Sequence, residues 1–168
     1  MIAIEVLDLT RDYNSERAVD GINFTVDQGE IFGYLGPNGA GKTTTIRMLT
    51  GQLRPTSGSA RVMDCDVVAE RQKLKPQIGV VFESQNLYER LSGRENLNFY
   101  ARLYRVDKSR VDQVLNQVGL VKRAKDKVGT YSNGMKQRLL IARAMLHEPR
   151  GLIQEENAWF VEHGTRDQ

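Results

Sequence analysis

The sequence has few prolines, a single cysteine and no long apolar run. It contains 4 Pro and only Cys65, which excludes an internal disulfide framework. No apolar run approaches the ~18 residues of a membrane-spanning helix, and residues 1–10 lack the basic start and apolar stretch of a secretion signal. The 168 residues, 40% hydrophobic and 27% charged, are typical of a soluble globular domain. We therefore expect one cytosolic domain.

Positive charge is concentrated in the second half of the chain. Residues 90–150 carry 14 basic and 5 acidic side chains, whereas residues 1–89 carry 9 and 12, and residues 151–168 carry 1 and 4. A basic segment can indicate a nucleic-acid or lipid partner. Here the basic residues are scattered among apolar positions, which favours a solvated helical surface. We therefore expect no nucleic-acid partner.

Apolar periodicity and turn residues divide the chain into strands and then helices. Strands are predicted at 2–9, 21–26, 30–35 and 78–82, and an extended or hairpin segment at 59–68. Helices are predicted at 41–49, 111–118 and 134–148, with Pro149 ending the last of them. This order predicts an α/β fold.

A phosphate-loop pattern, G-x-x-x-x-G-K-[ST], follows the strand predicted at 30–35 and precedes a predicted helix. It consists of Gly36, Pro37, Asn38, Gly39, Ala40, Gly41, Lys42, Thr43 and Thr44. Glycines let backbone N–H groups converge on phosphate oxygens at the positive end of a helix. Lys42 would supply a point charge to the β- and γ-phosphates, and the Thr43 hydroxyl could ligate Mg²⁺. The pattern predicts nucleotide binding.

A second motif covers residues 131–139. Ser132 is suited to cap a helix, and Asn133 and Gly134 tolerate unusual backbone angles. This helix start could face an anion, although capped helices are common and a purely structural role is the alternative.

Together these motifs resemble the ATP-binding cassette (ABC) family, specifically the ATP-binding subunits of bacterial export systems for drugs, antibiotics or ions. Residues 131–139 resemble the ABC signature, with Asn133 where the family usually has Gly. Residues 87–97 resemble the start of the family's helical subdomain. The resemblance covers about residues 1–150 and implies a phosphate-loop NTPase core with an N-terminal antiparallel β part and a helical subdomain.

The resemblance also assigns residues to an ATP site with Mg²⁺. Tyr13 matches the aromatic residue that stacks on adenine; the alternative is a packed tyrosine at a strand end. The glutamine that touches Mg²⁺ or water in the family corresponds by position to Glu83, and Gln85 follows two residues later. Either of the two could serve, and Gln85 is the predicted metal contact beside Thr43.

The resemblance implies two partners. Cassettes of this family sandwich two nucleotides head to tail, so Ser132, Asn133 and Gly134 would face the γ-phosphate held by a second ATP-binding subunit, in a homodimer or heterodimer. A membrane permease would be the other partner, and the chain would lie in the cytoplasm at the inner face of the membrane through that permease. Closure of the cassette dimer on ATP would drive export.

The carboxylates that the family uses for hydrolysis are not recognisable after Arg150. The family continues there into a strongly apolar strand, a Walker B aspartate and a catalytic glutamate, but here the apolar run is only Leu152 and Ile153. We interpret Glu155 and Glu156 as solvated charges. His163 is too close to be the family's switch histidine. The sequence therefore predicts a cassette cut short before Walker B, which binds ATP at most and hydrolyses it poorly.

The predicted organisation is a partial ATP-binding domain at 1–150, followed by an unmatched tail at 151–168. Within the domain we expect a β and phosphate-loop core at 1–85, a helical subdomain at 86–133 and a signature helix at 134–148. The core is incomplete at its C-terminal side, which predicts an unpaired sheet edge beside the phosphate-loop strand and marginal stability or aggregation. An inert fragment of a frameshifted or interrupted gene is the alternative. A soluble ABC ATPase of DNA repair or translation would predict a coiled-coil insertion or second cassette, and the sequence has neither.

Overall fold

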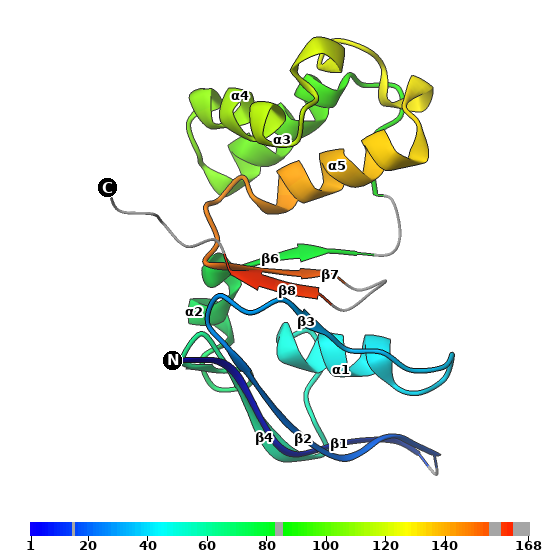
Figure 1. Cartoon of the computed structure of the whole chain (residues 1–168), viewed down its shortest axis with the longest axis vertical. Coiled ribbons are helices and arrows are strands. Elements are labelled where there is room, and N and C mark those ends of the chain that lie inside the picture. Colours follow the sequence, from blue (N-terminus) through cyan, green and yellow to red (C-terminus); the bar gives the residue numbers. More distant parts are fainter. Residues whose placement is uncertain (15, 83–85, 155–158, 163–168) are drawn as a thin grey trace. The chain divides into compact units, whose positions relative to one another are not determined.

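The structure of the chain is a computed structural model that describes residues 1–14, 16–82, 86–154 and 159–162, the last four by their backbone only. The chain divides into two compact units (Figure 1). The first unit comprises residues 1–80 and 150–168, and the second comprises residues 81–149. None of the helices in the described ranges has the length and apolar content that a bilayer crossing requires.

An antiparallel sheet with strand order β2-β1-β4-β5 forms one layer of the first unit. Its strands are β1 (Ile2–Tyr13), β2 (Glu16–Asp27), β4 (Ser57–Val62) and β5 (Cys65–Asp66). The first two strands are longer than predicted, because their pairing continues through polar residues that lack the apolar signal of a strand: Asp12 pairs with Arg17, and Tyr13 with Glu16. The segment 59–68, predicted as an extended or hairpin piece, falls in the antiparallel pair of β4 and β5, which the positive-φ residues Met63 and Asp64 separate.

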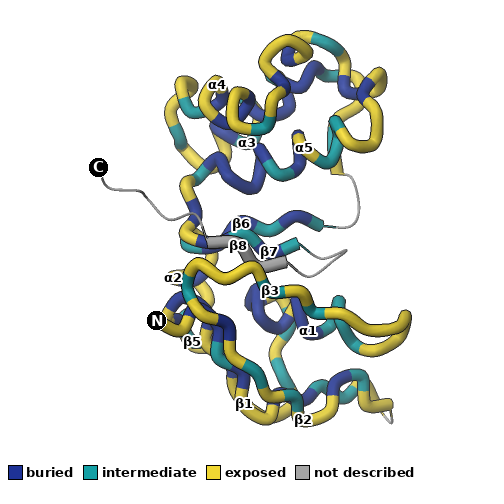
Figure 2. Tube along the Cα trace, in the orientation of Figure 1, coloured by how far each residue is buried: buried dark blue, intermediate teal, exposed yellow. Residues whose placement is uncertain are grey.

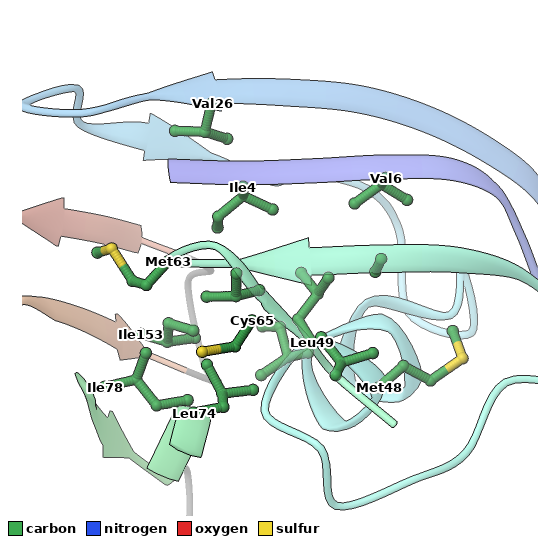
Figure 3. Packing of buried hydrophobic residues seen from close by; sticks show 14 of the residues in the cluster. Ile4, Val6, Val26, Met48, Leu49, Met63, Cys65, Leu74, Ile78 and Ile153 are labelled. Carbon is green, nitrogen blue, oxygen red and sulfur yellow. The ribbon is translucent and has the colours of Figure 1, made fainter. Parts of the chain in front are cut away.

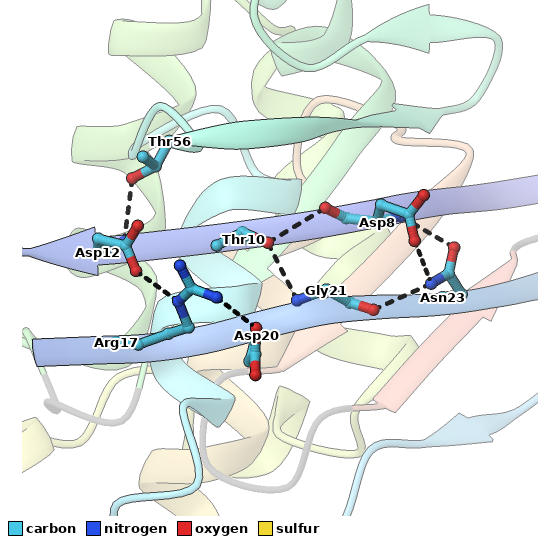
Figure 4. Close-up of polar contacts among 8 residues, drawn as sticks. All are labelled: Asp8, Thr10, Asp12, Arg17, Asp20, Gly21, Asn23 and Thr56. Atoms are coloured by element: carbon cyan, nitrogen blue, oxygen red, sulfur yellow. Dashed lines mark hydrogen bonds and ion pairs between the residues drawn. The ribbon is translucent and has the colours of Figure 1, made fainter.

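The long strand β1 is interrupted by a bulge near Asp8, which has φ 47°. The Asp8 amide donates to Oδ1 of Asn23 at 2.9 Å, and the Thr10 hydroxyl donates to the Asp8 carbonyl at 3.2 Å and accepts from the Gly21 amide at 3.0 Å (Figure 4). On the other side, Gly58 fits because a Cβ there would lie 2.2 Å from the Asp8 carbonyl oxygen. The bulge thus replaces regular ladder bonds with side-chain bonds.

A second sheet has the order β3-β8-β7-β6. Its strands are β3 (Phe32–Gly33), β6 (Ile78–Val81), β7 (Gly151–Gln154) and β8 (Trp159–Glu162). In contrast to the expected open edge, β3 pairs antiparallel with β8, and β8 pairs antiparallel with β7. Residues 151–154 and 159–162, for which the sequence predicts no element, therefore form two strands, and β8 lies along the edge of β3, the strand that precedes the phosphate loop.

The core of the first unit lies among the sheets and the helices α1 (Lys42–Leu49) and α2 (Arg71–Leu74). A short 3₁₀ helix, η1 (Lys75–Gln77), leads from α2 into β6. Side chains from distant parts of the chain meet in this core (Figure 3), including Val6, Met48, Leu74 and Ile153. Ile153 is 4% exposed, so strand β7 contributes to the core although its apolar run is short.

The second unit is helical. It contains α3 (Gly93–Tyr104), α4 (Lys108–Gln117), α5 (Asn133–Ala144) and the 3₁₀ helices η2 (Val121–Arg123) and η3 (Val128–Thr130). Each of α3, α4 and α5 has buried positions along its length (Figure 2). The buried apolar residues include Leu97, Val114 and Leu139. Sequence signals explain the helix starts: Ser92 forms a capping box with Glu95, and Asp107 caps α4. Helix α5 ends at Ala144, a turn earlier than predicted.

Candidate functional site

The glycine-rich loop joins β3 to α1 and is held against the neighbouring sheet at Gly41. This residue has φ 78°, in the left-handed region, and caps the N-terminus of α1. A Cβ at Gly41 would lie 2.2 Å from the carbonyl oxygen of Ala18 on β2, a contact that no side chain can make. Glycine is therefore required at this position both by backbone conformation and by space.

The first turn of α1 presents polar groups and positive charge. The Lys42 ammonium donates to the loop carbonyls of Gly36 at 2.6 Å and Pro37 at 2.7 Å. Thr43 and Thr44 are half-buried, and no acidic residue occupies the first turn of this helix. Unpaired N–H groups and the helix dipole make such an N-terminus attractive to anions, and no carboxylate of the turn opposes them.

Tyr13 lies at the end of β1 and is 43% exposed. The Arg11 guanidinium lies over the Tyr13 ring, with its Cζ atom 4.6 Å from the ring centroid. Strand pairing connects Tyr13 to the loop: Arg11 pairs with Val19 on β2, and Val19 and its neighbour Ala18 are the residues against which Gly41 packs. The first unit thus brings together the end of β1 that carries Tyr13 and the start of α1.

The residues predicted to contact a second nucleotide lie in the second unit, at the start of α5. Ser132 caps this helix by accepting a hydrogen bond from the Met135 amide at 3.3 Å. Ser132, Asn133 and Gly134 are exposed, and a Cβ on Gly134 would meet nothing within 4 Å. The first turn of α5 contains no acidic residue. This helix start is therefore accessible and suited to an anion.

The neighbouring Tyr131 is a buried structural residue. Its hydroxyl donates to the Arg123 carbonyl at 2.7 Å, and a Cβ on Gly93 would lie 2.4 Å from that hydroxyl oxygen. Burial raises the pKa of Tyr131 above its usual value. Tyr131 thereby fixes the loop that precedes Ser132 against the start of α3.

Two basic residues brace the first turns of α5 within the second unit. The Lys136 ammonium lies 2.6 Å from Oε1 of Glu89, and Arg138 donates to the Val118 carbonyl at 3.2 Å. The hydrogen bond from Lys136 and its charge lower the pKa of Glu89 below its usual value. The side chain of Lys136 is only 15% exposed, so this ammonium is engaged with Glu89 rather than free in solvent.

Several predicted residues lie outside the described ranges. These are the two candidates for the metal-contacting glutamine, Glu83 and Gln85, and also Glu155, Glu156 and His163. Among the described residues, no group of three His, Cys, Asp or Glu side chains could hold a metal ion. Thr43 is the predicted metal contact within the described part of the chain. A single hydroxyl suits Mg²⁺, which usually takes its other ligands from phosphates and water.

Sequence reasoning missed two contacts of this site. It did not foresee the Arg11 guanidinium over Tyr13, although residues two apart on a strand share a face and the spacing could have suggested it. The packing of Gly41 on Ala18 had no local signal, because it depends on how α1 lies against β2.

A strand, a glycine-rich loop and a helix that begins at Lys42, the lysine of the G-x-x-x-x-G-K-[ST] pattern, define the class of phosphate-loop proteins. Within this class, the sequence matches the ABC transporter family over residues 19–158. The chain therefore belongs to the ABC transporter family, as its motifs indicated.

Curated relatives are ATP-binding proteins of bacterial transport systems. The bacitracin transport ATP-binding protein BcrA of Bacillus licheniformis is 46% identical over 154 residues, which cover 91% of this chain and 50% of the relative. The linearmycin resistance ATP-binding protein LnrL of Bacillus subtilis is 41% identical over 168 residues, covering 98% of this chain and 54% of the relative. The chain spans about half the length of these relatives.

Solved structures confirm the predicted fold class. CbiO1 from Clostridium perfringens, part of the ABC transporter complex CbiONQ, matches with a TM-score of 0.80 and 28% identity, covering 91% of this chain and 64% of that one. An ATP-binding subunit of an ABC transporter matches with a TM-score of 0.73 and 29% identity. The α/β core with an N-terminal antiparallel sheet and a helical part is therefore that of ABC ATP-binding subunits.

Proposed function

We propose that this chain binds Mg-ATP as part of the ATP-binding subunit of an ABC transporter that drives export. The observation that carries the proposal is the phosphate loop, where Gly41 is packed against Ala18 at the start of α1 and the Lys42 ammonium lies over the loop. The proposal adds a ligand, a partner and a direction of transport to the family membership.

The loop's own contacts support a phosphate ligand. Lys42 donates to the carbonyls of Gly36 and Pro37, and phosphate oxygens would offer stronger, charged acceptors for the same ammonium. The backbone of residues 36–44 would wrap the phosphates, and Thr43 would hold the metal through its hydroxyl. Bound Mg²⁺ would neutralise charge between the β- and γ-phosphates. Tyr13 would stack on the adenine.

The exposed helix start at Ser132 supports the proposal that a second subunit with its own bound nucleotide is a partner of this chain. Ser132, Asn133 and Gly134 are exposed, and we propose that they contact the γ-phosphate of ATP bound by a second ATP-binding subunit. A membrane permease would complete the transporter and hold the chain at the inner face of the membrane. Export is favoured because BcrA is named for bacitracin transport and LnrL for linearmycin resistance, and a further relative from Mycobacterium tuberculosis, 44% identical over 155 residues, is named for fluoroquinolones export.

Binding and turnover of Mg-ATP by the 168-residue chain test the proposal. Lys42→Ala should weaken ATP binding at least tenfold, because it removes the charge over the loop. Lys73→Ala is the matched control, since Lys73 is an exposed lysine of the same unit that pairs with Glu70 at 2.9 Å. Equal ATP affinity in the wild-type and Lys42→Ala chains would refute the proposed site.

The turnover measurement also tests the expected weak hydrolysis. Hydrolysis needs a general base for water, and we interpret Glu155 and Glu156 as solvated charges. The wild-type chain should therefore bind ATP with little turnover, and Glu156→Gln should change neither quantity. Turnover that disappears in Glu156→Gln would show instead that this residue acts on water.

A further inference from the structure

Arg11 is held between the ring of Tyr13 and the main chain before β4. Its Cζ atom lies 4.6 Å from the Tyr13 ring centroid, and its Nη1 donates to the Arg54 carbonyl at 2.9 Å. Its Nε is buried and has no hydrogen-bond partner among the described residues. The guanidinium is thus positioned by the ring and one carbonyl, with no carboxylate paired to it in the described contacts.

The order of strands separates Arg11 from the phosphate loop. Strand β1, which carries Arg11 and Tyr13, lies between β2 and β4. Arg11 is anchored on the β4 side, because Arg54 precedes Ser57, the first residue of that strand. The loop approaches on the β2 side, where Gly41 packs on Ala18. Arg11 and a nucleotide held by the loop would therefore reach Tyr13 from different sides.

We propose that Arg11 and Tyr13 form one base-binding platform, in which Arg11 fixes the tyrosine ring from the β4 side and leaves the ring face on the β2 side for the base. This inference rests on the proposed nucleotide binding and deepens it. Arg11 is a positioning residue, since it acts on the base only through Tyr13.

Two physical effects make the platform favourable for a base. The guanidinium is attracted to the face of the ring by a cation–π interaction. The same contact restrains the rotamer of a partly exposed tyrosine, so less side-chain freedom remains to be lost when the base binds. The phosphate groups gain nothing from this pair, so its effect should depend on the presence of a base.

The experiment compares two ligands on the full chain, Mg-ATP and inorganic tripolyphosphate, which carries phosphates and no base. The variants are Arg11→Met, Tyr13→Ala and the double variant. Arg61→Met is the matched control: Arg61 lies in the same sheet and also donates to one main-chain carbonyl, that of Asp64, but it pairs opposite Glu5, away from Tyr13.

We expect Arg11→Met to weaken ATP binding about two- to fivefold, the size of an exposed cation–π contact, and to leave tripolyphosphate binding unchanged. In the Tyr13→Ala background the same substitution should have no effect on ATP. Arg61→Met should change neither ligand's affinity.

The outcomes distinguish the platform from the site itself. Unchanged ATP affinity in Arg11→Met, when Tyr13→Ala does weaken ATP, would overturn the platform and leave the proposed nucleotide site intact. Weakened binding of both ligands in Arg11→Met would show that Arg11 supports the fold as a whole, and it would also overturn the platform. If the wild-type chain bound neither ligand, the proposed function would fail and the platform with it.

Discussion

Gly41 approaches the Ala18 carbonyl so closely that a Cβ on Gly41 would lie 2.2 Å from the oxygen. This contact joins the start of α1 to β2, so the phosphate loop is positioned by the antiparallel sheet as well as by the strand that precedes it. The main chain of Ala18 therefore helps to hold the phosphate loop in place.

Gly41→Ala should destabilise the chain much more than Gly39→Ala. Both glycines have positive φ, 78° and 85°, and a non-glycine residue in this region costs about 1–2 kcal/mol. A Cβ on Gly39 would meet nothing within 4 Å, so the positive φ is the only expected source of destabilisation in Gly39→Ala. At Gly41 the clash with Ala18 adds a further ~1–3 kcal/mol.

Urea unfolding of both variants measures this difference. Equal free energies of unfolding for Gly39→Ala and Gly41→Ala would show that the sheet contact does not hold the loop.

Gly93→Ala and Tyr131→Phe should be non-additive. A Cβ on Gly93 would lie 2.4 Å from the Tyr131 hydroxyl oxygen but 3.2 Å from the ring carbon that carries it. Tyr131→Phe alone should cost about 0.5–1.5 kcal/mol, because it removes the part-buried hydrogen bond to the Arg123 carbonyl, which still accepts from the Asp126 amide at 3.0 Å. Removing the hydroxyl should relieve most of the clash that Gly93→Ala introduces.

A double-mutant cycle on the free energy of unfolding checks this coupling, which we expect to be about 0.5–3 kcal/mol in favour of the double variant. Strict additivity would contradict the packing of Tyr131 on Gly93.

The sequence predicts those parts of the fold whose signals are local. The helix at 41–49 follows from the residues after Gly41, and the helix at 111–118 from the spacing of Val111, Val114 and Leu115, which are all buried. The phosphate loop follows from its pattern. In each case the residues that form the element also carry the signal.

Elements that depend on distant partners could not be predicted in this way. Strand β7 has only Leu152 and Ile153 as an apolar run, and it forms because Ile153 enters the core and the backbone pairs with β8. Strand β8 in turn pairs with β3. The contact of Arg11 with Arg54 likewise spans 43 positions, and no local pattern encodes it.

Stability should fall at acidic pH partly through the pair of Glu89 and Lys136. The hydrogen bond from Lys136 and its charge lower the pKa of Glu89 in the folded chain below its usual value. As the pH falls, the unfolded chain therefore binds a proton at Glu89 at a higher pH than the folded chain does. The stabilisation by the pair is present above about pH 4.5 and is lost as the pH falls through the lowered pKa of the folded chain. Other carboxylates contribute to the same acid transition, so the comparison must be between variants.

Thermal unfolding of wild type, Glu89→Gln and Lys136→Met between about pH 7 and pH 3 separates this contribution. Both variants should be less stable than wild type near neutral pH, and the difference should shrink towards pH 3. High salt should reduce it as well, because Glu89 is exposed. A difference that is independent of pH would mean that the ion pair does not act on stability.

Two serine caps of the second unit offer a matched test of the signature helix. Ser92 is 9% exposed and forms a full capping box, accepting from the Glu95 amide at 3.2 Å while the Glu95 carboxylate accepts from the Ser92 amide at 2.7 Å. Ser132 is exposed and makes one long bond, 3.3 Å, to the Met135 amide. Ser92 should therefore contribute more than Ser132 to the stability of the fold. Ser132, which is exposed, is the serine that could contact a ligand.

Ser92→Ala should lower the free energy of unfolding by about 1–2 kcal/mol, and Ser132→Ala by about 0.5 kcal/mol. If Ser132 contacts the γ-phosphate held by a second subunit, as proposed, Ser132→Ala should also weaken Mg-ATP-dependent dimerisation, which light scattering would measure. Ser92→Ala should leave that dimer intact at temperatures where the variant is folded, because Ser92 is engaged with Glu95. Loss of the dimer in Ser92→Ala but not in Ser132→Ala would contradict the proposed contact between Ser132 and the γ-phosphate. Ser132 would then only cap helix α5.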